Sequence, residues 1–279
     1  LVEFRPAERA PAIAPGSHLT EPKGERSPCH YCGPCERGCS TGSYFSSLSA
    51  TLPAAFKTGR LAIRANSIVH SVLFDDKKGR VSGVQVVDAL SKETQIYRAK
   101  VVFLCASTIG STAIMLNSKS RTFPNGIANG SGVLGHYLMD HHFQLGAGGK
   151  FPEFNDRYYA GKRPNGIYIP RFQNLGQEKR TDYVRGYGYQ GGAGRSSWQR
   201  GNQLADFGAT LKAELREPGD WGFSLMGFGE TLPIYENRVW LDPDNTDQWG
   251  IPMLHIEAEW SQNELNMRKD ILASAAEMI

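Results

Sequence analysis

One stretch, residues 100–118, constrains the fold more than any other part of the chain. It opens with five apolar residues, 101–105, and this length and β-branched character are typical of a strand buried on both faces. Small residues and Gly110 follow, where the backbone can turn sharply. From Thr108 the apolar positions take a helical period. A strand, a tight turn and a helix form the unit that holds a nucleotide in many α/β proteins, although an ordinary strand–helix corner has the same pattern.

Composition excludes two broad classes. The chain has 279 residues, 40% of them hydrophobic, and a formal net charge of only +3 with both signs interspersed. A nucleic-acid binder would concentrate basic residues on one face, so we expect no nucleic-acid partner. No apolar run approaches the roughly 18 residues that cross a bilayer, so this stretch predicts no transmembrane segment. The chain begins at Leu1 and ends in a helix-like run, which indicates an interior fragment of a longer protein.

A compact run of cysteines is the second informative feature. Cys29, Cys32, Cys35 and Cys39 have the spacing C-x2-C-x2-C-x3-C, which matches a bacterial iron–sulfur run except that Ser40 replaces its proline. Three interpretations remain open. An iron–sulfur cluster fits the spacing best, zinc would more often draw on two separated knuckles, and local disulfides or free thiols are the third. The fifth cysteine, Cys105, is expected to be a buried thiol.

The segments after the cysteines predict a helix followed by a small sheet. Residues 43–57 carry an amphipathic pattern that Gly59 ends. Polar turns at 75–79 and 89–93 separate short strand-like runs, which predicts an antiparallel meander. The expected strands are 61–65, 67–74, 80–88 and 94–99.

From Phe143 the chain becomes rich in glycine and aromatic residues, with alternation and frequent turns. This pattern predicts strands of a separate antiparallel sheet, including two near 238–241 and 253–260. A final helix is expected to start at Ser261, with Glu264 at capping-box spacing.

One motif in this part is misleading. Gly186, Gly188 and Gly191 spell G-x-G-x-x-G, with Asp206 about 20 residues after the first glycine. The residues that follow have no apolar helical face, so no helix N-terminus is available for a pyrophosphate. We interpret the motif as a flexible loop or an edge strand.

Several segments resemble the glucose–methanol–choline (GMC) family of flavoprotein oxidoreductases. They are FLCASTIGSTAIMLNS at 103–118, SGVLGHYLMDHH at 131–142 and, more loosely, GIPMLHIEAEWS at 250–261. The resemblance covers residues 29–142 well. It implies an α/β (α+β) fold: a portion of a Rossmann-like FAD/NAD(P)-binding domain with a small antiparallel meander, plus an antiparallel-sheet substrate domain. The implied division is 1–142 with the Cys-rich insert 29–39, then 143–260, then 261–279 as the start of a C-terminal helix.

The resemblance also implies site residues. Val69 matches the position whose backbone faces the adenine of FAD, and Cys105, Ala106 and Ser107 lie toward the adenosine ribose, while Gly110 permits close packing of the next helix. The family's pyrophosphate loop matches nothing before Cys29, and its catalytic histidine is expected beyond Ile279, so no catalytic residue is assigned.

Four further histidines receive no catalytic or metal-binding assignment from the sequence. His136, His141 and His142 cluster around Asp140, which suggests a metal, but the family resemblance makes this segment structural. His255 lies on a predicted strand of the second sheet, where the sequence does not fix its direction.

The cysteine run narrows the resemblance to family dehydrogenases that act on sugars and polyols. Cys29, Cys35 and Cys39 match the three-thiolate site of their insert, and Cys32 is additional. We therefore expect an FAD-dependent enzyme that oxidises CH–OH groups of a sugar, polyol or other alcohol by hydride transfer, and that passes electrons through an iron–sulfur cluster to a cytochrome-type acceptor. The implied location is the bacterial periplasm or the membrane periphery.

Two alternatives remain open. One is a non-enzymatic binding protein whose four-cysteine run, Cys29 to Cys39, is a structural zinc or iron–sulfur site. The other is an oxygen-using GMC oxidase.

Overall fold

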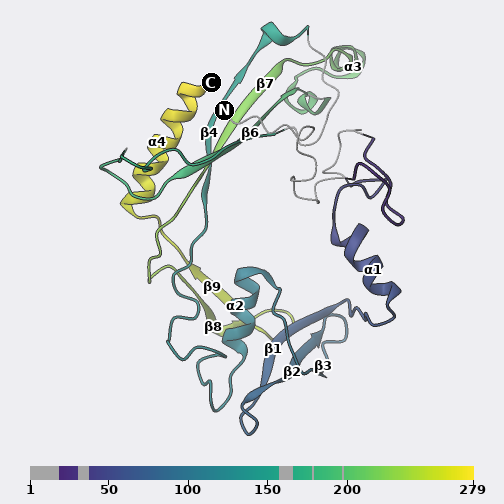
Figure 1. The fold of residues 1–279 in the computed structure, drawn as a ribbon, viewed down its shortest axis with the longest axis vertical. Helices are drawn as coiled ribbons and strands as arrows, with labels where there is room; N and C mark the ends of the chain where they lie inside the picture. Colours follow the sequence, from purple (N-terminus) through teal and green to yellow (C-terminus); the bar gives the residue numbers. More distant parts are fainter. Residues whose placement is uncertain (1–18, 31–37, 157–165, 178, 197) are drawn as a thin grey trace. The chain divides into compact units, whose positions relative to one another are not determined.

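The computed structural model describes residues 19–30, 38–156, 166–177, 179–196 and 198–279 (Figure 1). The chain forms two compact units, and each mixes helices with antiparallel strands. The large-sheet unit comprises Leu1–Ala62, His141–Glu230 and Gln262–Ile279, and the meander unit comprises Ile63–Asp140 and Thr231–Ser261. The predicted functional division at 142/143 and 260/261 stays a prediction.

The meander unit is built on three antiparallel strands in the order β1-β2-β3: β1 (Ser67–Asp75), β2 (Arg80–Asp88) and β3 (Thr94–Arg98). The polar turns form because Asp75 and Asp88 each accept backbone N–H groups two and three residues on, as Asx turns do. These three predicted strands are confirmed. The strand predicted at 61–65 is wrong: the structure has no strand there, because in the described sheet β1 is the edge and pairs only with β2.

A helix and a hairpin complete the meander unit. Helix α2 (Ser107–Asn117) packs against β1 and against β8 (Arg238–Thr246), which pairs with β9 (Pro252–Glu257). The Ser118 hydroxyl fixes the end of α2, since it accepts the Val72 N–H at 2.7 Å and donates to the Ile114 carbonyl. Apolar side chains from all these elements form the core of the unit: Val72, Val86, Val87, Ile114 and Val239.

The buried strand predicted at 101–105 is not found. The segment forms no ladder with any described strand, and Val101 and Phe103 are 65% and 84% exposed. Cys105, expected to be a buried thiol, is exposed as well. A strand of this kind is buried only when neighbouring strands pair with both its edges, and the described residues supply no such neighbour. The helix predicted after it is confirmed as α2.

Gly135 illustrates how tightly this unit is packed. Its φ is +90°, and a Cβ there would lie 2.2 Å from the Val239 carbonyl oxygen, while the Val239 N–H donates to the Gly135 carbonyl at 2.7 Å. Gly132 also has a positive φ, +75°, but open space around it. We expect Gly135→Ala to lower the free energy of unfolding by about 1–3 kcal/mol more than Gly132→Ala, because only Gly135 adds a clash to the backbone strain. Urea denaturation of both variants measures this, and equal losses would contradict it.

The large-sheet unit contains four antiparallel strands in the order β4-β7-β6-β5: β4 (His142–Lys150), β7 (Trp221–Gly229), β6 (Tyr187–Arg195) and β5 (Gly166–Ile169). The predicted C-terminal helix is confirmed as α4 (Gln262–Met278), drawn in yellow along β4 and β7 in Figure 1. Its buried residues Met267, Ile271 and Ala275 recur every four positions and pack on Tyr187, Tyr189 and Leu225. Shorter elements connect these strands: η4 (Pro152–Phe154), η5 (Trp198–Gln203) and α3 (Gly208–Arg216).

Two glycines of the G-x-G-x-x-G motif, Gly188 and Gly191, lie in β6: both pair with β7, and Gly191 also pairs with β5. The interpretation as a loop or edge strand is therefore wrong, since β6 is an inner strand. A Cβ at Gly191 would lie 2.3 Å from the Ser224 carbonyl oxygen, so the glycine permits the close approach of β7.

The N-terminal part of the large-sheet unit contains one broken helix. A π-helical turn, η3 (Ser47–Thr51), continues into α1 (Leu52–Lys57), and Gly59 follows with φ +67°, as expected for a helix end. Ser46 and Ser49 form a reciprocal capping box at its start. None of the helices in the described ranges combines the length and apolar character that a bilayer span requires.

Candidate functional site

Backbone hydrogen bonds tie together the two ends of the cysteine run. The Ser27 N–H donates to the Thr41 carbonyl at 3.0 Å, which closes the loop at its base. Leu19 joins both sides, since its carbonyl accepts the Cys29 N–H at 2.9 Å and its N–H donates to Ser43 at 2.9 Å. Ser43 is fully buried among these hydrogen-bonded segments. These hydrogen bonds hold the chain segments that carry Cys29 and Cys39 together, which is compatible with both cysteines binding one metal site.

Cys39 has the environment of a stabilised thiolate. The Tyr44 N–H donates to its Sγ at 3.4 Å, and the Thr41 Oγ1 lies at 3.4 Å from the same sulfur. These contacts, with that of Thr41 as the largest, lower the pKa of the Cys39 thiol. The thiolate is the metal-binding form of cysteine, and hydrogen bonds to sulfur tune iron–sulfur clusters. The surroundings of Cys39 therefore fit a cluster ligand.

The predicted metal site draws on four cysteines, of which Cys29 and Cys39 lie in the described residues. Cys32 and Cys35 lie outside the described residues. Within the described residues, which include only Cys29 and Cys39 of the four predicted ligands, no three His, Cys, Asp or Glu side chains converge on one point. The assignment of Cys29, Cys32, Cys35 and Cys39 as metal ligands stays a prediction.

The predicted FAD residues around α2 lie at a sharp turn. Ser107 is the first residue of α2 and has φ +61°, a left-handed conformation that is uncommon for a residue with a side chain. A Cβ at Gly110 would lie 3.3 Å from that of Ala106, so glycine leaves room for this turn. In the described chain no side chain caps the helix start. Exposed Cys105, Ala106 and Ser107 therefore present accessible backbone, which is what a nucleotide-binding turn needs.

Val69 lies in β1 opposite Val86, in the same unit as that turn. The ladder between β1 and β2 is irregular between Val69 and Ser71, so a bulge follows Val69 directly. Bulges free backbone groups from regular pairing and are frequent beside binding sites. The structure thus brings Val69 and the Cys105–Gly110 turn into one unit, while their assignment to FAD stays a prediction.

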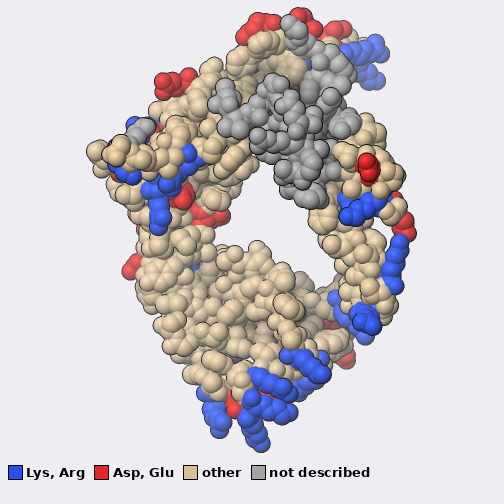
Figure 2. Space-filling model, viewed as in Figure 1, with Lys and Arg blue, Asp and Glu red and all other residues tan. Residues whose placement is uncertain are grey.

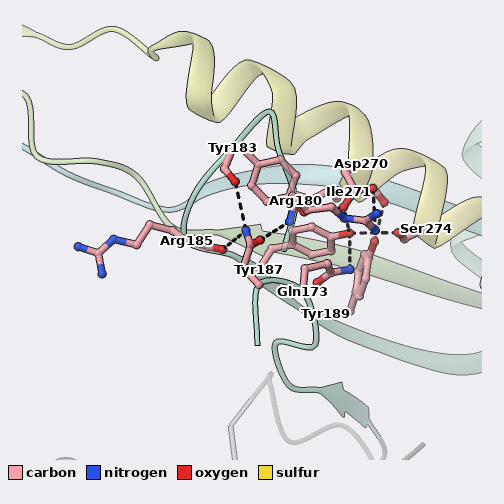
Figure 3. Close-up of polar contacts among 10 residues, drawn as sticks. Gln173, Arg180, Tyr183, Arg185, Tyr187, Tyr189, Asp270, Ile271 and Ser274 are labelled. Carbon is pink, nitrogen blue, oxygen red and sulfur yellow. Dashed lines mark hydrogen bonds and ion pairs between the residues drawn. The ribbon is translucent and has the colours of Figure 1, made fainter. Parts of the chain in front are cut away.

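A polar network that the sequence analysis missed lies beneath α4 in the large-sheet unit (Figure 3). The hydroxyls of Tyr183 and Tyr187 both donate to Asp270 Oδ2, at 2.6 and 2.9 Å, and Arg180 lies 3.3 Å from the other carboxylate oxygen. The Gln173 side-chain amide donates to the Tyr187 hydroxyl at 2.6 Å. Burial raises the pKa of both tyrosines, which keeps their hydroxyls protonated as donors.

Tyr189 belongs to the same layer and is fully buried. Its hydroxyl donates to the Ile271 carbonyl at 2.6 Å, and burial raises its pKa to about 12. The network joins strand residues to helix residues more than 80 positions away, so its role here is to hold α4 on the sheet. The alternation of Tyr187 and Tyr189 on one strand face was the only sequence signal.

The sequence did not predict the direction of the His255 side chain, and the structure shows its partners. Its Nε2 lies 2.7 Å from Asp242 Oδ2, and its ring stacks on Trp240, the directly opposite residue of β8. Asp242 also accepts N–H groups of Asn245 and Asp244, and these bonds, with Asn245 first, hold the pKa of the Asp242 carboxyl well below its usual range. The pair lies within the β8–β9 hairpin.

The histidines near Asp140 separate into different roles. In the meander unit His136 Nδ1 lies 2.8 Å from the Tyr235 carbonyl, and its ring stacks on that tyrosine. In the large-sheet unit His142 is fully buried, and burial, followed by the charge of Arg268, lowers its pKa. Both arrangements favour the structural interpretation over the metal one.

Comparison with known proteins finds similarity to GMC oxidoreductases. Residues 14–143 match the family model described as GMC oxidoreductase. The chain is 26% identical over 252 residues to 2-methyl-1,2-propanediol dehydrogenase of Mycolicibacterium austroafricanum, covering 88% of this chain and 45% of the relative. It is 26% identical over 252 residues to the fructose dehydrogenase large subunit of Gluconobacter japonicus, covering 90% and 44%.

A third relative is the gluconate 2-dehydrogenase flavoprotein of Pantoea cypripedii, 23% identical over 278 residues, covering 95% of this chain and 44% of the relative. The chain thus spans less than half the length of these curated relatives. The resemblance drawn from the sequence motifs is confirmed by the match of residues 14–143 to the GMC oxidoreductase family model.

Proposed function

We propose that the protein containing this chain is an FAD-dependent oxidoreductase that oxidises CH–OH groups of a sugar, a polyol or another alcohol. The match of residues 14–143 to GMC oxidoreductases carries this proposal. The names of the relatives support the substrate class, since they include a diol dehydrogenase and a fructose dehydrogenase. The same proposal assigns residues 1–142 to part of a Rossmann-like FAD-binding domain and the sheet of 143–260 to the substrate side.

The residues that would hold FAD lie in the meander unit. Val69 would offer backbone to the adenine, and the turn of Cys105, Ala106 and Ser107 would receive the adenosine ribose. The left-handed Ser107 supports this role, because it exposes backbone at the start of α2. Bound FAD supplies the hydride acceptor for alcohol oxidation. The base that removes the alcohol proton is expected beyond Ile279, so no described residue is given that role.

The cysteine run would hold an iron–sulfur cluster as an electron relay. Its tied base and the hydrogen-bonded sulfur of Cys39 support this assignment. A relay of this kind favours a dehydrogenase with a cytochrome-type acceptor over an oxygen-using oxidase. The resemblance to sugar and polyol dehydrogenases of the family supports the further proposal that the protein acts in the bacterial periplasm or at the membrane periphery.

The test uses the full-length protein purified without oxygen. Flavin, iron, acid-labile sulfide and zinc are quantified with the absorption spectrum, and a panel of polyols and sugars is then added. We expect a flavin band that bleaches with at least one alcohol, together with iron and sulfide. If the protein contains flavin but no iron, and the reduced flavin releases peroxide in air, the enzyme would be an oxidase and not a dehydrogenase. A colourless protein containing stoichiometric zinc would overturn the proposal.

A further inference from the structure

A basic pocket lies at one end of the meander, apart from every residue assigned above. Its volume is about 510 Å³, and it is formed where the β1–β2 turn meets the end of β3. Figure 2 shows Lys and Arg side chains gathered over this end of the meander. The lining residues are Asp75, Lys78, Arg80, Val81, Ser82, Arg98, Ala99 and Lys100.

The charge of this pocket is largely uncompensated. It contains four cationic side chains and one carboxylate, that of Asp75. Asp75 is occupied by its own turn, because it accepts two backbone N–H groups and pairs with Lys78 at 3.7 Å. Within the described residues Arg80, Arg98 and Lys100 form no ion pair. Three like charges facing one space repel each other and favour an anion between them.

A β-bulge shapes the pocket floor. Leu73 pairs with Gly83 and Phe74 with Val81, so Ser82 is the extra residue of β2. A bulge turns the side chain of its extra residue away from the regular alternation. Gly83 has φ +152°, and a Cβ there would lie 2.1 Å from the Tyr97 carbonyl oxygen, so only glycine lets β3 approach at this point.

The bulged Ser82 orients one guanidinium. Its hydroxyl donates to the Leu73 carbonyl at 3.2 Å and accepts from Arg98 Nη1 at 3.1 Å. The hydroxyl has one proton, so the bond to Leu73 leaves its lone pairs for Arg98. Arg98 is thereby held in place while most of its N–H donors remain available. An oriented guanidinium loses less side-chain entropy when it binds a ligand.

We infer that this pocket binds a small anion that carries a phosphate group. Phosphate oxygens accept the paired N–H groups of arginine in a bidentate manner, and lysine adds charge without directional demand. A single carboxylate would satisfy only part of the net charge of three that the pocket contains. The volume accommodates a phosphorylated small molecule, and the exposed rim gives it access.

The test measures the binding of inorganic pyrophosphate to the full-length protein by calorimetry at constant ionic strength, with chloride as the reference anion. We expect saturable binding that Arg80→Gln and Arg98→Gln each weaken about tenfold to a hundredfold, since each removes a charge-assisted contact. Arg64→Gln is the matched control: Arg64 is an exposed arginine of the same unit that does not line the pocket. Lys100→Gln removes a pocket charge at a side chain that forms no ion pair among the described residues, so weaker binding by this variant would reflect the lost charge and not a lost structural contact. Circular dichroism melts accompany each variant.

A competition arm separates the two sources of a phosphate group. Vesicles containing phosphatidic acid are mixed with the protein in the presence and absence of pyrophosphate. Vesicle binding that pyrophosphate displaces would identify a lipid headgroup, whereas pyrophosphate binding without vesicle binding would identify a soluble ligand. Either result supports the inference. Absence of saturable binding by the wild type, or equal affinity in wild type, Arg80→Gln and Arg98→Gln, would overturn it.

Discussion

Replacing Asp270 by alanine is expected to lower the free energy of unfolding by about 3–5 kcal/mol. The carboxylate accepts hydrogen bonds from Tyr183 and Tyr187, which are only 4% and 1% exposed, and it also pairs with Arg180. Without it the buried Tyr183 hydroxyl loses its acceptor, Tyr187 keeps only the Ser274 hydroxyl at 3.0 Å, and α4 loses one of its polar attachments to β6 (Figure 3). A buried hydroxyl cannot turn to water, so the variant bears the desolvation cost of Tyr183.

Equilibrium urea denaturation followed by tyrosine and tryptophan fluorescence measures this loss. Glu277→Ala is the matched control, because Glu277 is an exposed carboxylate on the same helix and should change stability by less than about 0.5 kcal/mol. If Asp270→Ala does not fold, Asp270→Asn replaces it: one carbonyl acceptor remains, so an intermediate loss is expected. A loss no larger than that of Glu277→Ala would show that the network does not attach α4.

Local patterns predicted the meander unit well. The strands β1, β2 and β3 are short runs separated by polar turns, and the side chains of Asp75 and Asp88 stabilise these turns. Helix α4 was predicted from Ser261 and Glu264, which have the spacing of a capping box. Each of these signals depends on residues close together in the sequence, which is why they could be read without a structure.

Pairing between distant segments was not predictable from the sequence. Strand β6 has the composition of a loop because its glycines serve close packing: a Cβ at Gly191 would reach the Ser224 backbone of β7. Likewise Gly227 leaves the space that Ile271 of α4 occupies, since a Cβ there would lie 2.4 Å from its side chain. Glycine suits a turn and a close approach equally, so only the neighbouring chain distinguishes the two.

The same limit applies to the sites. The Asp270 network joins residues more than 80 positions apart, and the Ser82–Arg98 contact depends on a bulge that no local pattern announces. The prediction of a buried strand at residues 101–105 was wrong for a related reason. Their composition is that of a buried strand, but burial depends on neighbours that the described chain does not supply. The cysteine spacing, by contrast, is itself a local signal for chemistry.

Replacing Cys39 by serine is the change with the largest expected functional effect. If the cysteine run holds a cluster as proposed, iron and sulfide per flavin should fall on the order of tenfold or more, because a hydroxyl is a much poorer iron ligand than a thiolate. Flavin content should remain unchanged, since the proposed FAD residues lie in the other unit. Iron and sulfide analysis with electron paramagnetic resonance of the reduced protein measures this. Ser40→Ala, an exposed neighbour, is the control and should retain its iron.

The companion variant Cys32→Ser determines how many thiolates the cluster uses. The family resemblance matches Cys29, Cys35 and Cys39 to a three-thiolate site, whereas the spacing of all four cysteines matches a four-thiolate run. Retention of iron in Cys32→Ser together with its loss in Cys39→Ser would establish the three-thiolate site. Loss in both would establish the four-thiolate site. Full iron in Cys39→Ser would contradict the assignment of Cys39 as a cluster ligand. The contacts of Tyr44 and Thr41 with the wild-type Cys39 sulfur would then stabilise a thiolate that binds no metal.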